Sequence, residues 1–144
     1  MVIGIIGENC SGKSTLAKEI QSVIGAEIIT GKDYLRMAKS ESEAEQLFKA
    51  KLQNAVNGGH IIYVISEKEH INLLPNGAIK ILAKADIDTI KERFKQRMRI
   101  LPAPVEQMLV RKHGMFDDGT YDYRYDGAAG NPDEICAAIK SKIQ

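Results

Sequence analysis

Residues 7–14 have the residue types and the spacing of a loop that binds phosphate. They read Gly-Glu-Asn-Cys-Ser-Gly-Lys-Ser and follow the apolar run 2–6. Glycines at positions 7 and 12 let successive backbone N–H groups turn toward one anion, and the start of the following helix adds a favourable dipole. In this pattern the lysine reaches the outer phosphates of a nucleotide, and the serine hydroxyl binds Mg²⁺. We therefore expect a nucleotide-phosphate site at Gly7, Glu8, Asn9, Cys10, Ser11, Gly12, Lys13, Ser14 and Thr15.

A second group of candidate residues is the basic segment 91–112, which contains seven Lys or Arg residues and two Glu residues. Arg93 and Arg97 are four positions apart and share one helix face. Planar guanidinium groups are well suited to neutralise the oxygens of a phosphoryl group during its transfer. Arg93 and Arg97 are therefore candidate catalytic residues. A solvated helix face is expected to carry Lys91, Lys95, Arg99 and Lys112.

A magnesium ion at Ser14 needs an acidic partner, and the sequence offers two. Asp33 follows the second expected strand, where its carboxylate would bind the metal directly or through water. Asp33 could also act as a base toward a hydroxyl acceptor, or cap the helix that follows it; these roles stay open. Glu67, just past the expected strand 61–65, is a weaker candidate because no Asp ends that strand.

The elements that position these residues follow from the hydrophobic pattern. Apolar or alternating runs predict strands over 2–6, 26–30, 61–65, 79–83 and 121–125. Helical spacing predicts helices from the loop to residue 24, from residue 33, and over 40–56, 86–98, 105–113 and 132–143, with a connection over 66–77. Strand and helix alternate throughout, which is typical of parallel connections. We expect an α/β chain: a three-layer P-loop NTPase fold with a central parallel sheet of about five strands, in one domain over residues 1–144.

The composition excludes several classes of protein. The chain has 144 residues, 44% of them hydrophobic and 27% charged, with a formal net charge of +1. This near-neutral charge disfavours a protein that coats nucleic acid, and no stretch reaches the roughly 20 apolar residues of a membrane span. The first residues have no basic leader, and the two cysteines have no metal or redox spacing. We expect a cytoplasmic protein that binds neither nucleic acid nor a membrane; the sequence does not predict its oligomeric state.

The motifs and their order resemble the nucleoside monophosphate kinase group of P-loop kinases, to which adenylate and cytidylate kinases belong and near which shikimate and gluconate kinases stand. Residues 30–36, Thr-Gly-Lys-Asp-Tyr-Leu-Arg, are similar to the group's acceptor segment Thr-Gly-Asp-x-x-Arg, with one residue inserted. Residues 93–97 resemble its Arg-x-x-x-Arg at the start of a lid. The resemblance implies that Arg36 binds the acceptor, that Arg93 contacts the donor base, and that Arg97 and Arg111 bind phosphates. It also implies ATP and Mg²⁺ as cofactors.

These observations predict ATP-dependent phosphoryl transfer to a small molecule, with Lys13, Arg93, Arg97 and Asp33 as catalytic residues. Arg36 favours an anionic acceptor, most simply a nucleoside monophosphate. A hydroxyl-acceptor kinase of the shikimate or gluconate type and a nucleotide-binding module without catalysis are the alternatives. A GTPase is disfavoured, because the segment 83–86, Ala-Lys-Ala-Asp, lacks the Asn that reads guanine. Residues 31–59 leave room for a reduced acceptor-binding segment, and residues 98–104 for a short lid.

Overall fold

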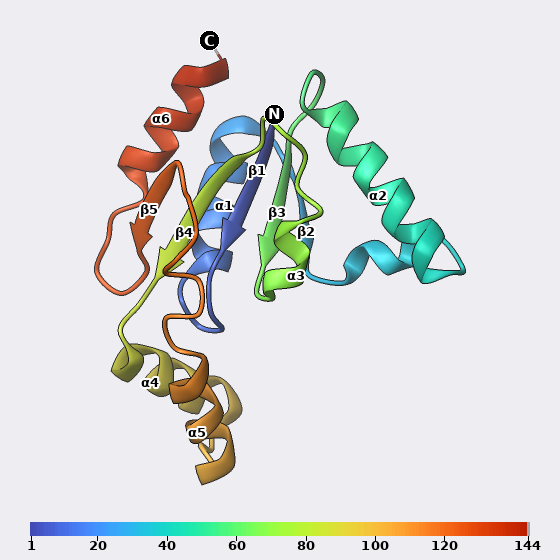
Figure 1. Ribbon diagram of the computed structural model, residues 1–144. Coiled ribbons are helices and arrows are strands. Elements are labelled where there is room, and N and C mark those ends of the chain that lie inside the picture. The colour runs from blue at the N-terminus through green and yellow to red at the C-terminus, as the bar shows by residue number, and fades with distance from the viewer. Residues whose placement is uncertain (144) are drawn as a thin grey trace.

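A single sheet of five parallel strands forms the centre of the computed structural model, which describes residues 1–143 (Figure 1). The strands are β1 (Val2–Ile6), β2 (Glu27–Thr30), β3 (Ile61–Ile65), β4 (Ile79–Lys84) and β5 (Tyr123–Asp126). Their order in the sheet is β2-β3-β1-β4-β5. All residues of β1 and β3 are buried, as expected for apolar strands in the middle of a parallel sheet.

Helices surround this sheet on both faces and at one end. They are α1 (Lys13–Ile24), the 3₁₀ helix η1 (Asp33–Met37), α2 (Glu41–Ala55), α3 (Lys68–Ile71), α4 (Ile87–Met98), α5 (Ala103–Lys112) and α6 (Asp133–Ile143). In Figure 1, α4 and α5 lie beyond the carboxyl ends of the strands. The phosphate-loop segment also lies at that end, between β1 and α1.

The core is divided by the sheet into two layers of apolar side chains. On one face, Leu16 and Ile20 of α1 and Ile139 of α6 pack against the strands. On the other, Phe48 and Leu52 of α2 pack against strand residues and Phe116. The prediction of a three-layer α/β fold with a five-stranded parallel sheet is therefore confirmed.

The structure departs from the predicted elements most clearly at three places. Residues 66–77 contain the short helix α3 in addition to a turn. The last strand begins at Tyr123, because the side-chain carboxylate of Asp122 accepts the N–H of Lys80 that a strand residue would otherwise pair with. Helix α5 begins at Ala103, since Pro104 lies in the first turn, where a missing N–H removes no helical hydrogen bond.

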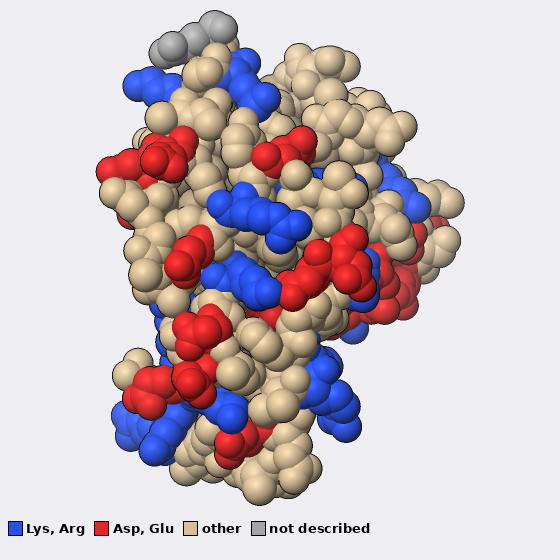
Figure 2. Space-filling view, turned by 60° about the vertical axis from the view of Figure 1, so that its left-hand side comes forward, with Lys and Arg blue, Asp and Glu red and all other residues tan. Residues whose placement is uncertain are grey.

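The face of the molecule in Figure 2 carries charges of both signs. Lys and Arg side chains occur there together with Asp and Glu side chains, and no continuous basic surface covers this view. None of the helices within residues 1–143 combines the length and the apolar character that crossing a membrane requires.

Candidate functional site

The loop between β1 and α1 has a backbone conformation that depends on glycine at two positions. The φ angle of Gly12 is 98°, in the left-handed region that favours glycine. A Cβ on Gly7 would collide with the carbonyl oxygen of Ala83 and the hydroxyl of Ser11. Cys10 also has a positive φ, 65°, although it is not a glycine. The loop is thus tightly wound against the carboxyl end of the sheet.

The N-terminus of α1 is open to an anion. Its N-cap is Gly12, which makes no side-chain cap hydrogen bond, and its first turn contains no acidic residue. By contrast, Ser40 caps α2 and Asp86 caps α4 through side-chain oxygens. The first N–H groups of a helix have no intrahelical acceptor, so those of α1 are left to bind a ligand.

Lys13 lies inside the loop that it is expected to serve. Its Nζ donates hydrogen bonds to the carbonyl oxygens of Gly7 (2.8 Å) and Glu8 (2.6 Å), and the residue is buried. The pKa of the Lys13 ammonium is lowered to about 8, mainly by burial and in small part by the nearby charge of Arg97, while the charges of Cys10 and Glu8 oppose this shift. The exposed Arg97 of α4 therefore lies close enough to the loop for its charge to act on Lys13.

Arg93 joins three parts of the chain. Its guanidinium donates one hydrogen bond to the carbonyl oxygen of Cys10 (3.0 Å) and another to that of Gly127, in the segment between β5 and α6. A Cβ on Gly127 would collide with the carbonyl oxygen of Ser11, so this segment packs directly on the phosphate loop. The sequence prediction left the Arg93 side chain free to reach a nucleotide, whereas here its N–H groups bind the backbone.

Glu8 connects the phosphate loop to the end of α5. Its carboxylate accepts a hydrogen bond from the Gly114 N–H (3.0 Å), and its Oε1 lies 3.1 Å from Nδ1 of His113. The sequence analysis gave His113 no role. A polar loop residue and a histidine far from it in the chain carry no pattern that would predict such a contact.

The basic residue of α5 that lies beside the loop is Lys112. It lines a small cavity of about 30 Å³ together with Glu8 and Asn9 of the loop. Arg111, the predicted phosphate ligand, lines a different surface pocket with Ala103, Glu106, Gln107 and Val110. Adjacent helix positions point about 100° apart, which agrees with the two side chains lining different cavities. A larger cavity, about 740 Å³, lies between β4, β5 and the residues after β5, and no residue of the range 7–15 lines it.

The predicted acceptor residues are exposed on η1. Neither Asp33 nor Arg36 makes a side-chain hydrogen bond or ion pair with the residues that the structure describes. Asp33 is the first residue of η1, and this helix has no side-chain cap, so the capping role is not observed. Tyr34 between them is buried and stacks on Phe48, with ring centroids 5.0 Å apart and planes 6° apart.

This edge of the sheet carries hydroxyl and carboxylate groups of the kind that bind magnesium. Ser14 is exposed at the start of α1, and Asp33 and Glu67 are exposed just after β2 and β3, which are neighbours in the sheet. Hydroxyl and carboxylate oxygens are the ligands that Mg²⁺ prefers. Ser14 with one of the two carboxylates would hold the ion that accompanies a nucleotide.

Sequence comparison finds no protein-family model and no curated protein that matches the chain. Comparison with solved structures does find similar folds. An uncharacterized protein from Eubacterium ventriosum is 17% identical with a TM-score of 0.68, over 99% of this chain and 98% of that one. A sugar kinase from Janibacter sp. is 15% identical with a TM-score of 0.66, over 99% and 93%. A shikimate kinase from Acinetobacter baumannii, in complex with shikimate, is 15% identical with a TM-score of 0.62, over 99% and 92%.

These matches extend over almost the whole length of both chains, and the sheet and its helices therefore correspond from end to end. At identities this low the likeness concerns the fold. The chain has the fold of the P-loop small-molecule kinases.

Proposed function

We propose that this protein transfers the terminal phosphoryl group of ATP to a small molecule. The observation that carries the proposal is the preformed loop around Lys13, whose ammonium group is held by two loop carbonyls next to the uncapped N-terminus of α1. Phosphoryl transfer is catalysed mainly by positioning and by neutralising phosphate oxygens, and this arrangement suits both tasks.

The roles of the side chains follow from their positions. Lys13 and the first N–H groups of α1 would bind the outer phosphates of ATP, with Lys13 exchanging its loop carbonyls for phosphate oxygens. Arg97 and Lys112 would approach the same phosphates from α4 and α5. Arg93 would hold the loop in shape through Cys10 and Gly127. Magnesium, bound at Ser14 and one carboxylate, would neutralise charge on the phosphates.

We infer that the acceptor carries a hydroxyl group. Such an acceptor must lose a proton, and Asp33 is an exposed carboxylate without a partner among the described residues. The ring of Tyr34 packs on Phe48 and is therefore not free to stack on the base of a nucleotide acceptor. Two proteins of similar fold are a sugar kinase and a shikimate kinase, and sugars and shikimate are hydroxyl compounds. The segment 31–59 would bind this acceptor, and the residues around 98–104 would form a short lid.

The second candidate acceptor is a nucleoside monophosphate, which the sequence favoured over a hydroxyl compound. Arg36 supports it, since this guanidinium is exposed one turn along η1 from Asp33 and makes no ion pair with the described residues. A nucleoside monophosphate presents an ionised oxygen and would need no base, so the two candidates differ in what they require of Asp33.

An ADP-release assay with ATP and Mg²⁺ tests the proposal and separates the acceptors. The panel is shikimate, gluconate, neutral sugars and the common nucleoside monophosphates, with Lys13→Met as the blank. We expect turnover on a hydroxyl compound that Lys13→Met abolishes and that Asp33→Asn lowers by at least about a hundredfold. Turnover on a monophosphate that tolerates Asp33→Asn would establish the second candidate. ATP binding without turnover on any compound would favour a nucleotide-binding module instead.

A further inference from the structure

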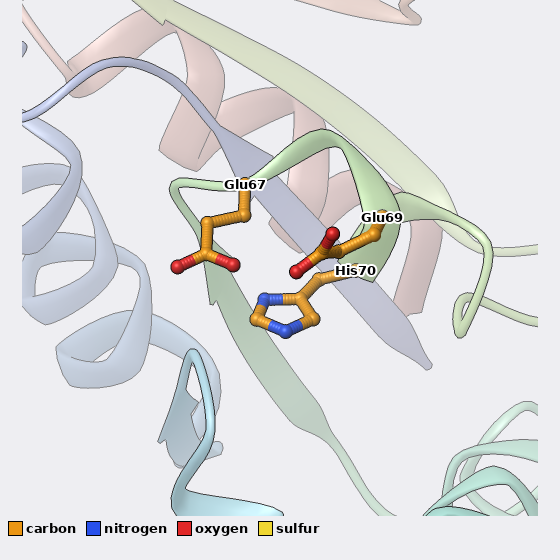
Figure 3. A group of neighbouring side chains, drawn as sticks. All are labelled: Glu67, Glu69 and His70. Carbon is orange, nitrogen blue, oxygen red and sulfur yellow. The ribbon is translucent and has the colours of Figure 1, made fainter.

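Three side chains that could bind a metal ion converge just after β3. The three belong to the short segment after β3: Glu67 is the N-cap residue of α3, and Glu69 and His70 lie in its single turn. Figure 3 shows both carboxylates and the imidazole directed toward one point. One ligand atom from each residue can be chosen so that all three lie within 4.8 Å of one another.

The histidine of this group is buried and its Nδ1 has no partner. His70 is 5% exposed, and its Nδ1 makes no hydrogen bond with the described residues. The ring lies between Tyr34 and Tyr63, with centroids 6.1 Å and 6.3 Å away. An unsatisfied polar atom in such a place is costly. One nitrogen of the ring faces the two carboxylates in Figure 3. A group bound between this nitrogen and the carboxylates would therefore remove the cost of the unsatisfied atom.

The two carboxylates also lack a balancing cation. Both glutamates are exposed, and neither has an ion pair with a Lys or Arg of residues 1–143 within 4.0 Å. The two glutamates lie within hydrogen-bonding reach of each other, and the charges of Lys32, His70 and Lys112 act on Glu67 from farther away. Two ionised carboxylates at close range repel each other unless a proton or a cation lies between them.

We propose that Glu67, Glu69 and His70 bind a divalent transition-metal ion, with Nδ1 of His70 as the buried ligand. Imidazole and carboxylate ligands together suit Zn²⁺, Mn²⁺ or Co²⁺, whereas Mg²⁺ prefers oxygen alone. With Glu67 in this site, Asp33 is the carboxylate left for the magnesium ion at Ser14. Ligand atoms lie about 2 Å from a bound metal ion, and the exposed glutamates can turn to reach that distance. Three protein ligands leave a position open to water or to an anion.

Isothermal titration calorimetry with ZnCl₂ tests the proposal on the full chain, without nucleotide and at about pH 7.5, where a histidine is mostly neutral. The variants are Glu67→Gln, Glu69→Gln and His70→Gln. The matched control is His60→Gln, because Nδ1 of His60 is also buried without a partner but belongs to no such cluster. Thermal unfolding of every variant without metal confirms that it is folded.

We expect the native chain to bind one equivalent of Zn²⁺, and each of the three cluster substitutions to weaken binding at least about tenfold, while His60→Gln leaves it unchanged. Zn²⁺ should also raise the melting temperature of the native chain more than that of Glu69→Gln. The proposal is overturned if no stoichiometric binding occurs, if Glu69→Gln binds as the native chain does, or if equal Mg²⁺ displaces the Zn²⁺. Since Glu67 and Glu69 are exposed, their variants keep the test valid if His70→Gln does not fold.

Discussion

At the phosphate loop, side chains that are neighbours in sequence have different surroundings. Lys112 shares a cavity with loop residues Glu8 and Asn9, while Arg111 lines a pocket on another face of α5. The resemblance to nucleotide kinases pointed to Arg111, because it lies at the matching place in the sequence. Which of two adjacent basic residues faces a loop depends on the rotation of the helix about its axis and on how the helix packs.

This pair of residues allows a matched test at the level of single side chains. We expect Lys112→Met to lower kcat/KM for ATP-dependent turnover about tenfold, because a charge near the phosphates is lost, and Arg111→Met to lower it less than twofold. Steady-state kinetics with the best acceptor of the panel measures both. A larger effect of Arg111→Met would show that α5 turns its other face to the substrate.

Glu8 gives a second prediction at this scale, one about stability. Glu8→Ala removes the acceptor of the Gly114 N–H and the partner of His113, and both contacts are partly buried. The free energy of unfolding should fall by about 1–3 kcal/mol, the usual cost of leaving such groups unpaired. Urea unfolding measures it. Glu106→Ala, which removes an exposed ion pair with Lys91, should cost less than about 1 kcal/mol; equal losses in the two variants would contradict the role of Glu8.

At the scale of elements, the segment between β5 and α6 packs directly on the phosphate loop, which its sequence does not predict. Gly127 packs on Ser11 and Gly12, and its carbonyl oxygen accepts a hydrogen bond from Arg93 of α4. Three segments that are distant in the chain therefore fix one another's positions at the carboxyl end of the sheet.

We expect Gly127→Ala to disturb this contact strongly, because the new methyl group would overlap the Ser11 carbonyl oxygen, and backbone atoms cannot move aside easily. Affinity for ATP should fall at least about tenfold, and the protein should unfold at a lower temperature. Calorimetry and thermal unfolding measure the two effects. Gly58→Ala is the control, since the nearest atom to its Cβ would be 4.0 Å away and its φ is not positive. If both variants bind ATP equally, the packing of Gly127 does not shape the site.

The sequence predicted the elements well and the contacts between them poorly, for a physical reason. Strand and helix are encoded by local periodicity, so the run 61–65 and the capped helix after Ser40 are evident from the residues alone. The loop pattern at 7–14 is equally local. The contacts of Arg93 with Cys10 and of Glu8 with His113 join residues 83 and 105 positions apart. These contacts depend on how the elements pack, and no periodic pattern in a single sequence encodes that packing.

For the molecule as a whole, the burial of Lys13 affects stability as a function of pH. In the folded chain its pKa is about 8, below the ordinary value of 10.5 that applies when the chain is unfolded. Between these two values the unfolded chain binds more protons than the folded chain, so the free energy of unfolding rises with pH in this window.

We expect this contribution to add about 2 kcal/mol to the free energy of unfolding between pH 8 and pH 10. Urea unfolding at several pH values measures it, and Lys13→Met is the control, because this variant keeps the volume of the side chain but has no titrating group. The slope against pH should be smaller in Lys13→Met than in the native chain. Identical slopes would contradict the low pKa of Lys13.

The wide separation of the residues that shape the phosphate loop has a consequence for the order of folding. Contacts between residues 83 and 105 positions apart form slowly, because a long stretch of chain must be closed before they exist. The loop can take its final shape only after α4, the end of α5 and the segment after β5 have docked. Nucleotide would then bind the completed fold and no earlier intermediate, so ATP should slow unfolding while leaving the first steps of refolding unchanged.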